Sequence, residues 1–178
     1  RKFGIHSAMA SSRAYRLCPE AIFVRPRFDA YKEASNQIRE IFWRYASEVE
    51  PLSLDEAYLD VTYTESFNGS ATLIAKAIKS EILAETGLIA SAGVSYNKFL
   101  AKIASDMDKP DGLYLIRPEQ GQEFVNKLPI GKFHGIGPAT EAKMKNLGIH
   151  TGNELRQKTL AELTERFGKS GQYYYNIA

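Results

Sequence analysis

The sequence predicts an α+β fold, in which a sheet domain is followed by a small domain made only of helices. Strand-like and helix-like patterns alternate over residues 21–128, as is typical of mixed helix and sheet domains. From Pro129 onward the patterns are short and helical, and no convincing strand follows. The segment Pro129-Ile130-Gly131 divides the two regions, because proline and glycine interrupt regular structure. With 178 residues, of which 44% are hydrophobic and 25% charged, the chain can bury one sizeable core or two small ones.

Apolar residues that recur every three or four positions predict four helices in the first region. In the second of these, Ile74, Ile78 and Ile82 form a row along one face, and Gly87 is expected to end the helix. Pro110 is expected to end the third, because the residue before a proline avoids helical geometry. The expected helices cover residues 28–45, 70–86, 97–107 and 119–128.

Runs of apolar and β-branched residues predict the strands that separate these helices. Residues 21–24 form a short run of this kind, and residues 48–62 form a longer one that Pro51 and two adjacent acidic residues interrupt. A hairpin between residues 49–54 and 57–62 would place those two acids at its tip, since proline is poorly tolerated within a central strand. Two further strands are expected over residues 89–95 and 113–116.

Charge is distributed unevenly along the chain, although the formal net charge is only +2. Residues 1–32 carry seven Lys or Arg against two acids, residues 33–70 carry two against eight, and residues 129–178 carry seven against four. An acidic centre between basic flanks suits a site that binds cations together with a polyanion. A mosaic of solvated charged faces would give the same pattern, so the distribution alone leaves both interpretations open.

Composition also indicates the cellular compartment in which the protein works. The single cysteine, Cys18, excludes a disulfide framework within the chain and favours an intracellular setting, so we expect a cytoplasmic protein. No apolar run approaches the length of a membrane span, and the basic start lacks a signal-peptide core, so no membrane association is expected. Because the chain opens on Arg1 rather than Met, we interpret it as a fragment.

Asp55 and Glu56 interrupt an otherwise apolar, strand-like segment at residues 52–61. A carboxylate in such a segment is costly unless it is paired or bound to a metal. Adjacent strand residues point to opposite faces, so these two carboxylates can share a site only where the chain turns. Mg²⁺ favours one or two carboxylates together with water and phosphate oxygens. The pattern therefore allows a metal site or an ordinary polar turn, and a pair of metal ions would need a further ligand from elsewhere.

Basic residues repeat along the helix expected at residues 97–107. At about 100° per residue, Lys98, Lys102 and Ser105 fall on one face, and Lys109 would continue that stripe. A solvated lysine face explains this pattern as readily as a phosphate-binding face does. The opposite face is apolar and is expected to pack against the sheet; its members are Phe99, Leu100, Ile103 and Met107.

A glycine-rich turn, Gly135-Ile136-Gly137, precedes a helix expected over residues 139–147. Glycine lets the backbone approach a phosphate closely, and the free N–H groups at a helix N-terminus favour an anion. Such a contact reads no bases, so it would grip a nucleic-acid strand irrespective of sequence. A plain turn between two helices is the alternative. Nearby positive charge favours the nucleic-acid interpretation; it comes from Lys132, Lys143 and Lys145.

Four motifs resemble those of the Y-family DNA polymerases, and they occur in the family's order over almost the whole chain. The segment Ser53-Leu54-Asp55-Glu56-Ala57-Tyr58-Leu59-Asp60 resembles the family's second catalytic motif. Residues 99–107 with Lys109-Pro110 resemble its palm helix. Arg1-Lys2-Phe3-Gly4 resembles its fingers motif, and His134-Gly135-Ile136-Gly137 resembles its thumb hairpin.

The resemblance implies a ferredoxin-like polymerase palm with small fingers and a helix–hairpin–helix thumb. It also implies the activity, a template-directed and error-prone transfer of deoxynucleotides to a primer 3′ hydroxyl, which serves translesion synthesis and repair of damaged DNA. An enzyme of this kind would act as a mutator. The implied division of the chain is a fingers remnant at residues 1–20, a palm at 21–128 and a thumb at 129–178.

Site residues follow from the same resemblance, residue by residue. Asp55 would be a metal ligand, and Glu56 a ligand or near-ligand beside the primer 3′ hydroxyl; both would be catalytic. The implied cofactor is Mg²⁺, with two ions in the complete site. Lys109 and, less directly, Lys102 would contact the incoming deoxynucleoside triphosphate, and Arg1 would clamp its β- and γ-phosphates, for which a guanidinium is well suited. The primer backbone would contact Gly135, Ile136, Gly137 and Lys143.

Parts of the family's machinery fall outside these residues. In the family a further catalytic aspartate, the aromatic residue that excludes ribonucleotides and a fingers tyrosine precede the position of Arg1, and a little-finger domain follows that of Ala178. We therefore expect the isolated chain to be inactive. For the full-length protein, the implied partners are primer–template DNA, deoxynucleoside triphosphate and a sliding clamp, and we expect a monomer.

Two other classes of function fit parts of the pattern. A non-catalytic DNA-binding module would use the glycine turn and the basic flanks. A nucleotide cyclase would use a similar palm but would have no role for the helix–hairpin–helix. Both catalytic interpretations require a divalent metal at Asp55 and the binding module does not, so metal binding separates them.

Overall fold

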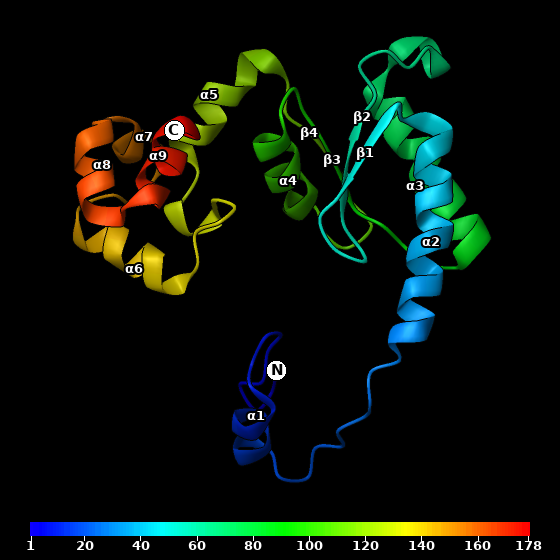
Figure 1. The fold of residues 1–178 in the computed structure, drawn as a ribbon, viewed down its shortest axis with the longest axis horizontal. Helices are drawn as coiled ribbons and strands as arrows, with labels where there is room; N and C mark the ends of the chain where they lie inside the picture. The colour runs from blue at the N-terminus through cyan, green and yellow to red at the C-terminus, as the bar shows by residue number, and fades with distance from the viewer. The chain divides into compact units, whose positions relative to one another are not determined.

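The computed structural model describes all 178 residues, which form two compact units, Arg1–Glu33 and Ala34–Ala178 (Figure 1). The first unit contains the short helix α1 (Ser11–Leu17) and the first turns of α2 (Phe28–Tyr45). The second contains the rest of α2, all the strands and the remaining helices. None of the helices combines the length and the apolar character that crossing a membrane requires.

Four short strands form two separate two-stranded sheets. β1 (Glu48–Pro51) and β2 (Ala57–Asp60) pair antiparallel as a hairpin, which confirms the hairpin expected from the sequence. β3 (Ala92–Val94) and β4 (Leu113–Leu115) pair in parallel. Parallel strands need a long crossover, which a helix between β3 and β4 provides. The strands expected at residues 89–95 and 113–116 are therefore present in shorter form.

The predicted helices of the first region are confirmed, and α3 (Ala71–Thr86) shows why its bounds could be predicted. The Leu73 N–H donates to the Ser70 hydroxyl at the start of α3, as at many helix N-termini. Gly87 ends the helix in a left-handed conformation, with a φ of 68°. α2 has the bounds expected, and α5 is shifted by one residue, to Pro118–Lys127.

Helix α4 (Lys98–Met107) packs directly on β3. The Leu100 N–H donates to the side chain of Asn97 at 2.9 Å, which caps the first turn. Gly93 on β3 permits a close approach, because a Cβ there would lie only 2.1 Å from the Ala101 carbonyl oxygen. The close packing fixes α4, and with it the lysine face predicted from the sequence, relative to the strands.

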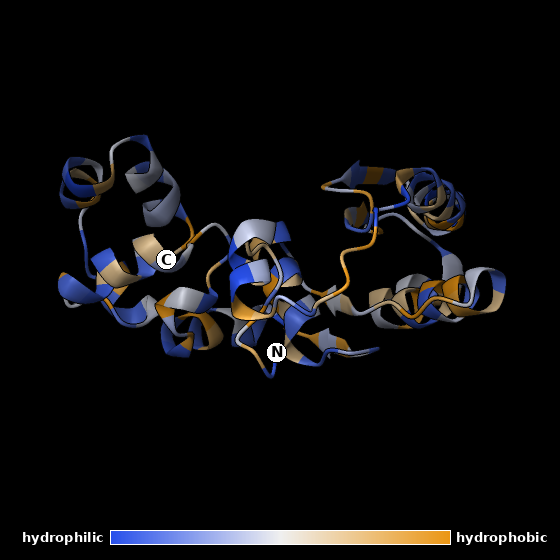
Figure 2. Ribbon diagram, turned by 90° about the horizontal axis from the view of Figure 1, so that it is seen from below, coloured by the Kyte–Doolittle hydropathy of each residue, from blue (hydrophilic) through white to orange (hydrophobic).

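Beyond Pro129 the chain is entirely helical, as predicted. A turn of 3₁₀-helix at Ile130–Lys132 leads to four short α-helices. These are α6 (Pro138–Asn146), α7 (Gly152–Arg156), α8 (Leu160–Phe167) and α9 (Lys169–Asn176). Figure 2 shows orange and blue residues interspersed along several helices of the chain, as expected for amphipathic helices with one buried face.

Two apolar cores support the second unit. The first is a set of isoleucines where α2 packs against α3, and it includes Ile41, Ile74 and Ile82. The second begins on α4 and continues through α5 into the helices beyond Pro129. Within it the rings of Phe99 on α4 and Phe133 lie 5.4 Å apart between centroids. The packing that positions α4 is thus continuous with the packing of the all-helical region.

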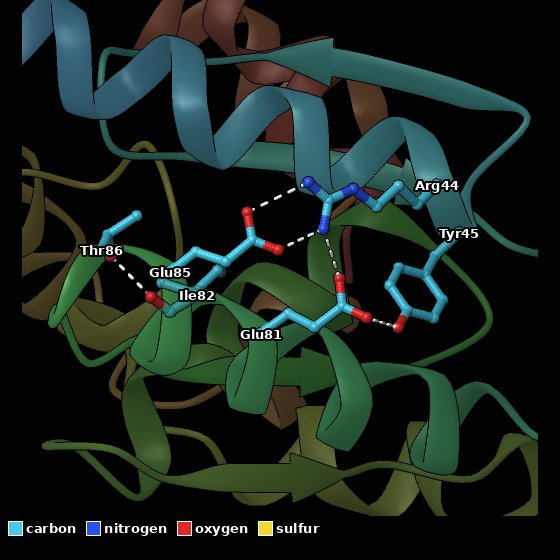
Figure 3. A network of polar contacts seen from close by, with 6 residues as sticks. All are labelled: Arg44, Tyr45, Glu81, Ile82, Glu85 and Thr86. Carbon is cyan, nitrogen blue, oxygen red and sulfur yellow. Dashed lines mark hydrogen bonds and ion pairs between the residues drawn. The ribbon is translucent and has the colours of Figure 1, made fainter.

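A polar cluster joins the end of α2 to the end of α3 (Figure 3). The Arg44 guanidinium donates to both carboxylate oxygens of Glu85 and, at 3.0 Å, to Glu81. The Tyr45 hydroxyl donates to the other oxygen of Glu81. The hydrogen bond from Arg44 holds the pKa of Glu85 below its ordinary value of 4.5. A two-pronged contact of this kind restricts the angle between the two helices.

Replacing Glu85 with glutamine is expected to lower the urea midpoint of unfolding slightly, and the loss should depend on pH. A carboxyl group whose pKa is depressed in the folded state contributes stability above its unfolded pKa and loses that contribution as the pH falls through the folded pKa. The difference between wild type and Glu85→Gln should therefore shrink from about pH 7 towards about pH 3. A difference that stays constant over this range would contradict an ionic contact; Glu165→Gln, at an exposed position of α8 without an ion-pair partner, is a suitable control.

Two expectations were wrong, and one helix was missed. Residues 21–24 are not a strand, because no strand of the chain pairs with them, and Ile22 and Val24 are 90% and 83% exposed. Helix α1 was not predicted, since its seven residues have no clear apolar period. Met107 does not pack against the sheet but is 47% exposed, because it lies at the last position of α4.

Candidate active site

The tip of the β1–β2 hairpin carries Asp55 and Glu56. The N–H groups of Leu52 and Ser53 donate to the Glu56 carbonyl oxygen at 2.9 and 3.2 Å, which closes the turn. Because the chain leaves strand geometry here, the two carboxylates are not forced to opposite faces. Asp55 is exposed and the Glu56 side chain is 40% exposed, so both can reach ligands. The predicted location of the two acids at a hairpin tip is confirmed.

Ser53 orients the Asp55 side chain. Its hydroxyl donates to Asp55 Oδ1 at 2.6 Å and accepts the Asp55 N–H at 3.3 Å. Ser53 was not among the predicted site residues, although a serine two residues before an aspartate in a turn is a recognisable local signal. The hydroxyl leaves the second carboxylate oxygen of Asp55 without a partner in the chain.

The hairpin tip and helix α4 meet at an ion pair. Lys102 Nζ lies 2.9 Å from Glu56 Oε1, and the Lys102 side chain is only 14% exposed. Partial burial lowers the pKa of Lys102, but the hydrogen bond with Glu56 and the nearby charge of Asp106 outweigh it, so that the pKa is raised. Lys102 is therefore a charged partner of Glu56. One turn earlier on α4, Lys98 pairs with Glu50 of β1.

Lys109 lies at the end of a row of alternating charges that starts at Glu56. After Lys102 comes Asp106, at 3.8 Å from Lys102 Nζ and 2.6 Å from Lys109 Nζ. Burial alone would raise the pKa of Asp106, but the hydrogen bond with Lys109 and the charge of Lys102 lower it. Lys109 is half exposed and has only this one partner. Of the two lysines predicted to contact a nucleotide, Lys109 has the ammonium that is more available.

The oxygen atoms of Asp55 and Glu56 are of the kind that Mg²⁺ prefers. Two neighbouring carboxylates with exposed oxygens can hold one such ion, provided that water or phosphate oxygens complete the coordination. No group of three or more histidine, cysteine or acidic residues in the chain is arranged to hold a metal. The residues present therefore fit part of a metal site.

The glycine turn before α6 exposes several backbone N–H groups. Phe133 and Ile136 are buried and anchor the turn in the core, while Gly135 and Gly137 are exposed. Gly135 has a φ of +84°, a left-handed conformation that favours glycine. Four N–H groups of the turn and of the start of α6 lack a hydrogen-bond partner in the chain: those of Gly135, Gly137, Ala139 and Thr140. A helix N-terminus with free N–H groups is suited to bind an anion.

Tyr173 of α9 supports this turn and was not predicted as a site residue. Its hydroxyl donates to the His134 carbonyl oxygen at 2.9 Å, and its ring lies 3.2 Å from where a Gly135 Cβ would be. The predicted contact of Lys143 with DNA stays a prediction; within the chain its ammonium donates to the Arg166 carbonyl oxygen of α8 and lies over the Phe167 ring. Lys145 pairs with Glu141, whereas Lys132 is exposed and unpaired.

Arg1 belongs to the other compact unit, Arg1–Glu33. It is exposed, and its carbonyl oxygen accepts a hydrogen bond from the Gly4 N–H at 2.8 Å. Its predicted contact with a nucleotide therefore stays a prediction.

Sequence comparisons identify relatives over the whole chain. The sequence model of the impB/mucB/samB family matches residues 1–106, and that of the IMS family HHH motif matches residues 118–149. DNA polymerase IV of Alkalilimnicola ehrlichii is 58% identical over 178 residues, which are all of this chain and 50% of that protein. DNA polymerase IV of Clostridioides difficile is also 58% identical, over all of this chain and 49% of that protein. The chain thus spans about half the length of the curated relatives it matches.

Solved structures show the same architecture. The crystal structure of DinB from Sulfolobus solfataricus is similar with a TM-score of 0.88 and 37% identity, over all of this chain and 53% of that one. An insertion ternary complex of Dbh DNA polymerase has a TM-score of 0.87 and 36% identity, over all of this chain and 52% of that one. A related chimera is described as a Y-family DNA polymerase; it has a TM-score of 0.85 and 37% identity, over 99% of this chain and 52% of that one.

Proposed function

Because the chain belongs to the impB/mucB/samB family of Y-family DNA polymerases, we propose that it forms most of the catalytic face of an error-prone, translesion DNA polymerase. The observation that supports this most directly is the meeting of the Asp55–Glu56 hairpin tip with α4, through Glu56 and Lys102. Opposed acidic and basic side chains of this kind suit a reaction between a metal-bound hydroxyl and a polyphosphate. In that reaction the primer 3′ hydroxyl attacks the α-phosphorus of a deoxynucleoside triphosphate, and pyrophosphate leaves.

Each residue of the site has a proposed task. Asp55 and Glu56 hold Mg²⁺, of which the complete site takes two ions, and Glu56 lies beside the primer hydroxyl. Bound there, the metal supplies positive charge to the reacting oxygens. Lys102 keeps Glu56 in place by their 2.9 Å contact, and with Arg1 and Lys109 it contributes positive charge towards the triphosphate. Asp106 restricts the Lys109 ammonium by their 2.6 Å contact. These residues thereby position the nucleotide for attack.

The glycine turn before α6 is proposed to bind the primer backbone. Free N–H groups at Gly135 and Gly137 and at the start of α6 suit a phosphate oxygen, and the exposed Lys132 adds positive charge. Ile136 contributes as the buried anchor of the turn. Lys143 serves the grip indirectly, by joining α6 to α8. The remaining proposals concern the full-length protein: a cytoplasmic monomer that copies damaged DNA and binds a sliding clamp.

Primer extension tests this function. The 178 residues contain two of the carboxylates that two metal ions require, and the relatives are about twice as long. Full-length protein should extend a primer opposite a template in the presence of Mg²⁺, whereas residues 1–178 alone should show no extension under the same conditions. Extension by residues 1–178 alone would show that the metal site is complete without a further ligand. Absence of extension by the full-length protein would refute the function itself.

A further inference from the structure

The loop that carries Lys109 has a conformation that does not form easily by itself. It joins α4 to β4 over residues 108–112. Asp111 has a φ of +54°, which a residue with a side chain adopts only at a cost of about 1 kcal/mol or more. A Cβ at Gly112 would lie 1.7 Å from the Asp108 carbonyl oxygen, so the two ends of the loop are in close contact. Such a loop persists only where the surrounding structure holds it.

Lys79 of α3 holds this loop. Its ammonium donates to the carbonyl oxygen of Asp111 and, at 3.1 Å, to that of Gly112. It also lies 3.0 Å from the Asp111 carboxylate. An ammonium group has three donors, so the loop engages all of them. The Lys79 side chain is only 15% exposed, so water competes weakly for these contacts.

The other polar contacts of the loop engage Gly112 and Lys109 but not Asp111. Gly112 is joined to the neighbouring strand segment, where it donates to the Ser91 hydroxyl at 3.3 Å and accepts the Ala92 N–H at 3.0 Å. On the other side of the loop, Lys109 pairs with Asp106, which is half exposed. Within the loop, Asp111 therefore depends on Lys79 for its conformation, and Asp111 is two residues from Lys109.

We propose that Lys79 is a positioning residue for the incoming nucleotide, which acts by fixing the loop that presents Lys109. The proposal rests on the proposed function, in which Lys109 contacts the triphosphate. Lys79 does not contact the nucleotide itself, because the loop occupies its ammonium. Loss of Lys79 frees Asp111 to leave its left-handed conformation, and the Lys109 ammonium then samples positions away from the phosphates.

The test is steady-state primer extension by the full-length protein with the Lys79→Met substitution. We expect the KM for the nucleotide to rise about fivefold while kcat changes less than about twofold, because a ground-state contact is weakened. Lys79→Arg keeps a charged donor and should restore most of the KM. Lys76→Met is the matched control: Lys76 lies three residues earlier on α3, is exposed and has no ion-pair partner, so its KM should be that of wild type. An unchanged KM in Lys79→Met would overturn the proposal.

A double substitution separates positioning from general destabilisation. Lys109→Ala should itself raise the KM, and adding Lys79→Met should raise it no further, because Lys79 acts through Lys109. Additive effects would mean that Lys79 acts by another route and would overturn the proposal. If Lys109→Ala leaves the KM unchanged, the proposed role of Lys109 fails instead. Thermal unfolding of each variant, with assays kept well below the melting temperature, excludes unfolding as the cause.

Discussion

Replacing Asp55 with asparagine is expected to abolish primer extension by the full-length protein, with a loss of about a thousandfold or more. Asparagine keeps the size of the side chain but removes its negative charge, and a hard divalent cation depends on that charge. Titration calorimetry with Mn²⁺ should show binding by the wild type that the Asp55→Asn variant has lost. Because Asp55 is exposed, its replacement should leave the melting temperature almost unchanged.

Asp60 provides a matched control for Asp55. It lies at the far end of the same hairpin, in β2, and its carboxylate accepts the Thr62 N–H at 2.9 Å. Asp60→Asn removes the same charge from the same hairpin, yet it should leave Mn²⁺ binding and extension close to wild type. Equal Mn²⁺ binding by wild type and Asp55→Asn would count against a metal site at the hairpin tip. It would favour the alternative interpretation, a DNA-binding module without catalytic activity.

Local signals were sufficient to predict much of the fold. Ser70 and Gly87 mark the two ends of α3. A serine N-cap and a left-handed glycine begin and end a helix in the same way in most structural contexts. Pro51 and the acids of the hairpin tip likewise predicted the turn between β1 and β2. Residues 21–24 have the composition of a strand and still form none, because a strand also needs a neighbour, which composition does not reveal.

The contacts that join the elements could not be predicted in the same way. Glu56 and Lys102 are 46 residues apart in the sequence, and their pairing depends on how closely α4 packs on β3 at Gly93. The partners of Lys79 and Tyr173 are also distant in the sequence, at separations of 33 and 39 residues for Gly112 and His134. Periodicity shows which face of a helix is polar but not which side chain that face meets. The resemblance to a family predicted which residues have a chemical role, whereas the residues that support them could be identified only from the structure.

Substituting Gly137 with alanine is expected to weaken binding to primer–template DNA about tenfold, or about 1.4 kcal/mol. Gly137 has an ordinary φ of −85°, and a Cβ placed there meets no atom of the protein within 4 Å. Alanine therefore fits the fold sterically, although at the residue before a helix it is less favourable than glycine by roughly 0.5–1 kcal/mol. The added methyl group would occupy the space in which a phosphate oxygen approaches the free Gly137 N–H. Fluorescence anisotropy with a labelled primer–template over a range of salt concentrations measures the loss.

Gly148→Ala is the opposite control. The fold requires glycine at position 148, but this position lies at the other end of α6 from the proposed phosphate contact. Its φ of +74° means that Gly148→Ala should destabilise the protein by about 1 kcal/mol. The DNA affinity of Gly148→Ala should be that of wild type, whereas Gly137→Ala should lose affinity although its melting temperature falls no further than that of Gly148→Ala. Because the proposed grip reads phosphates and not bases, the loss in Gly137→Ala should be similar on unrelated sequences, and wild-type binding should weaken steeply with salt. Unchanged affinity in Gly137→Ala, or a loss confined to one DNA sequence, would rule out a backbone contact at this turn.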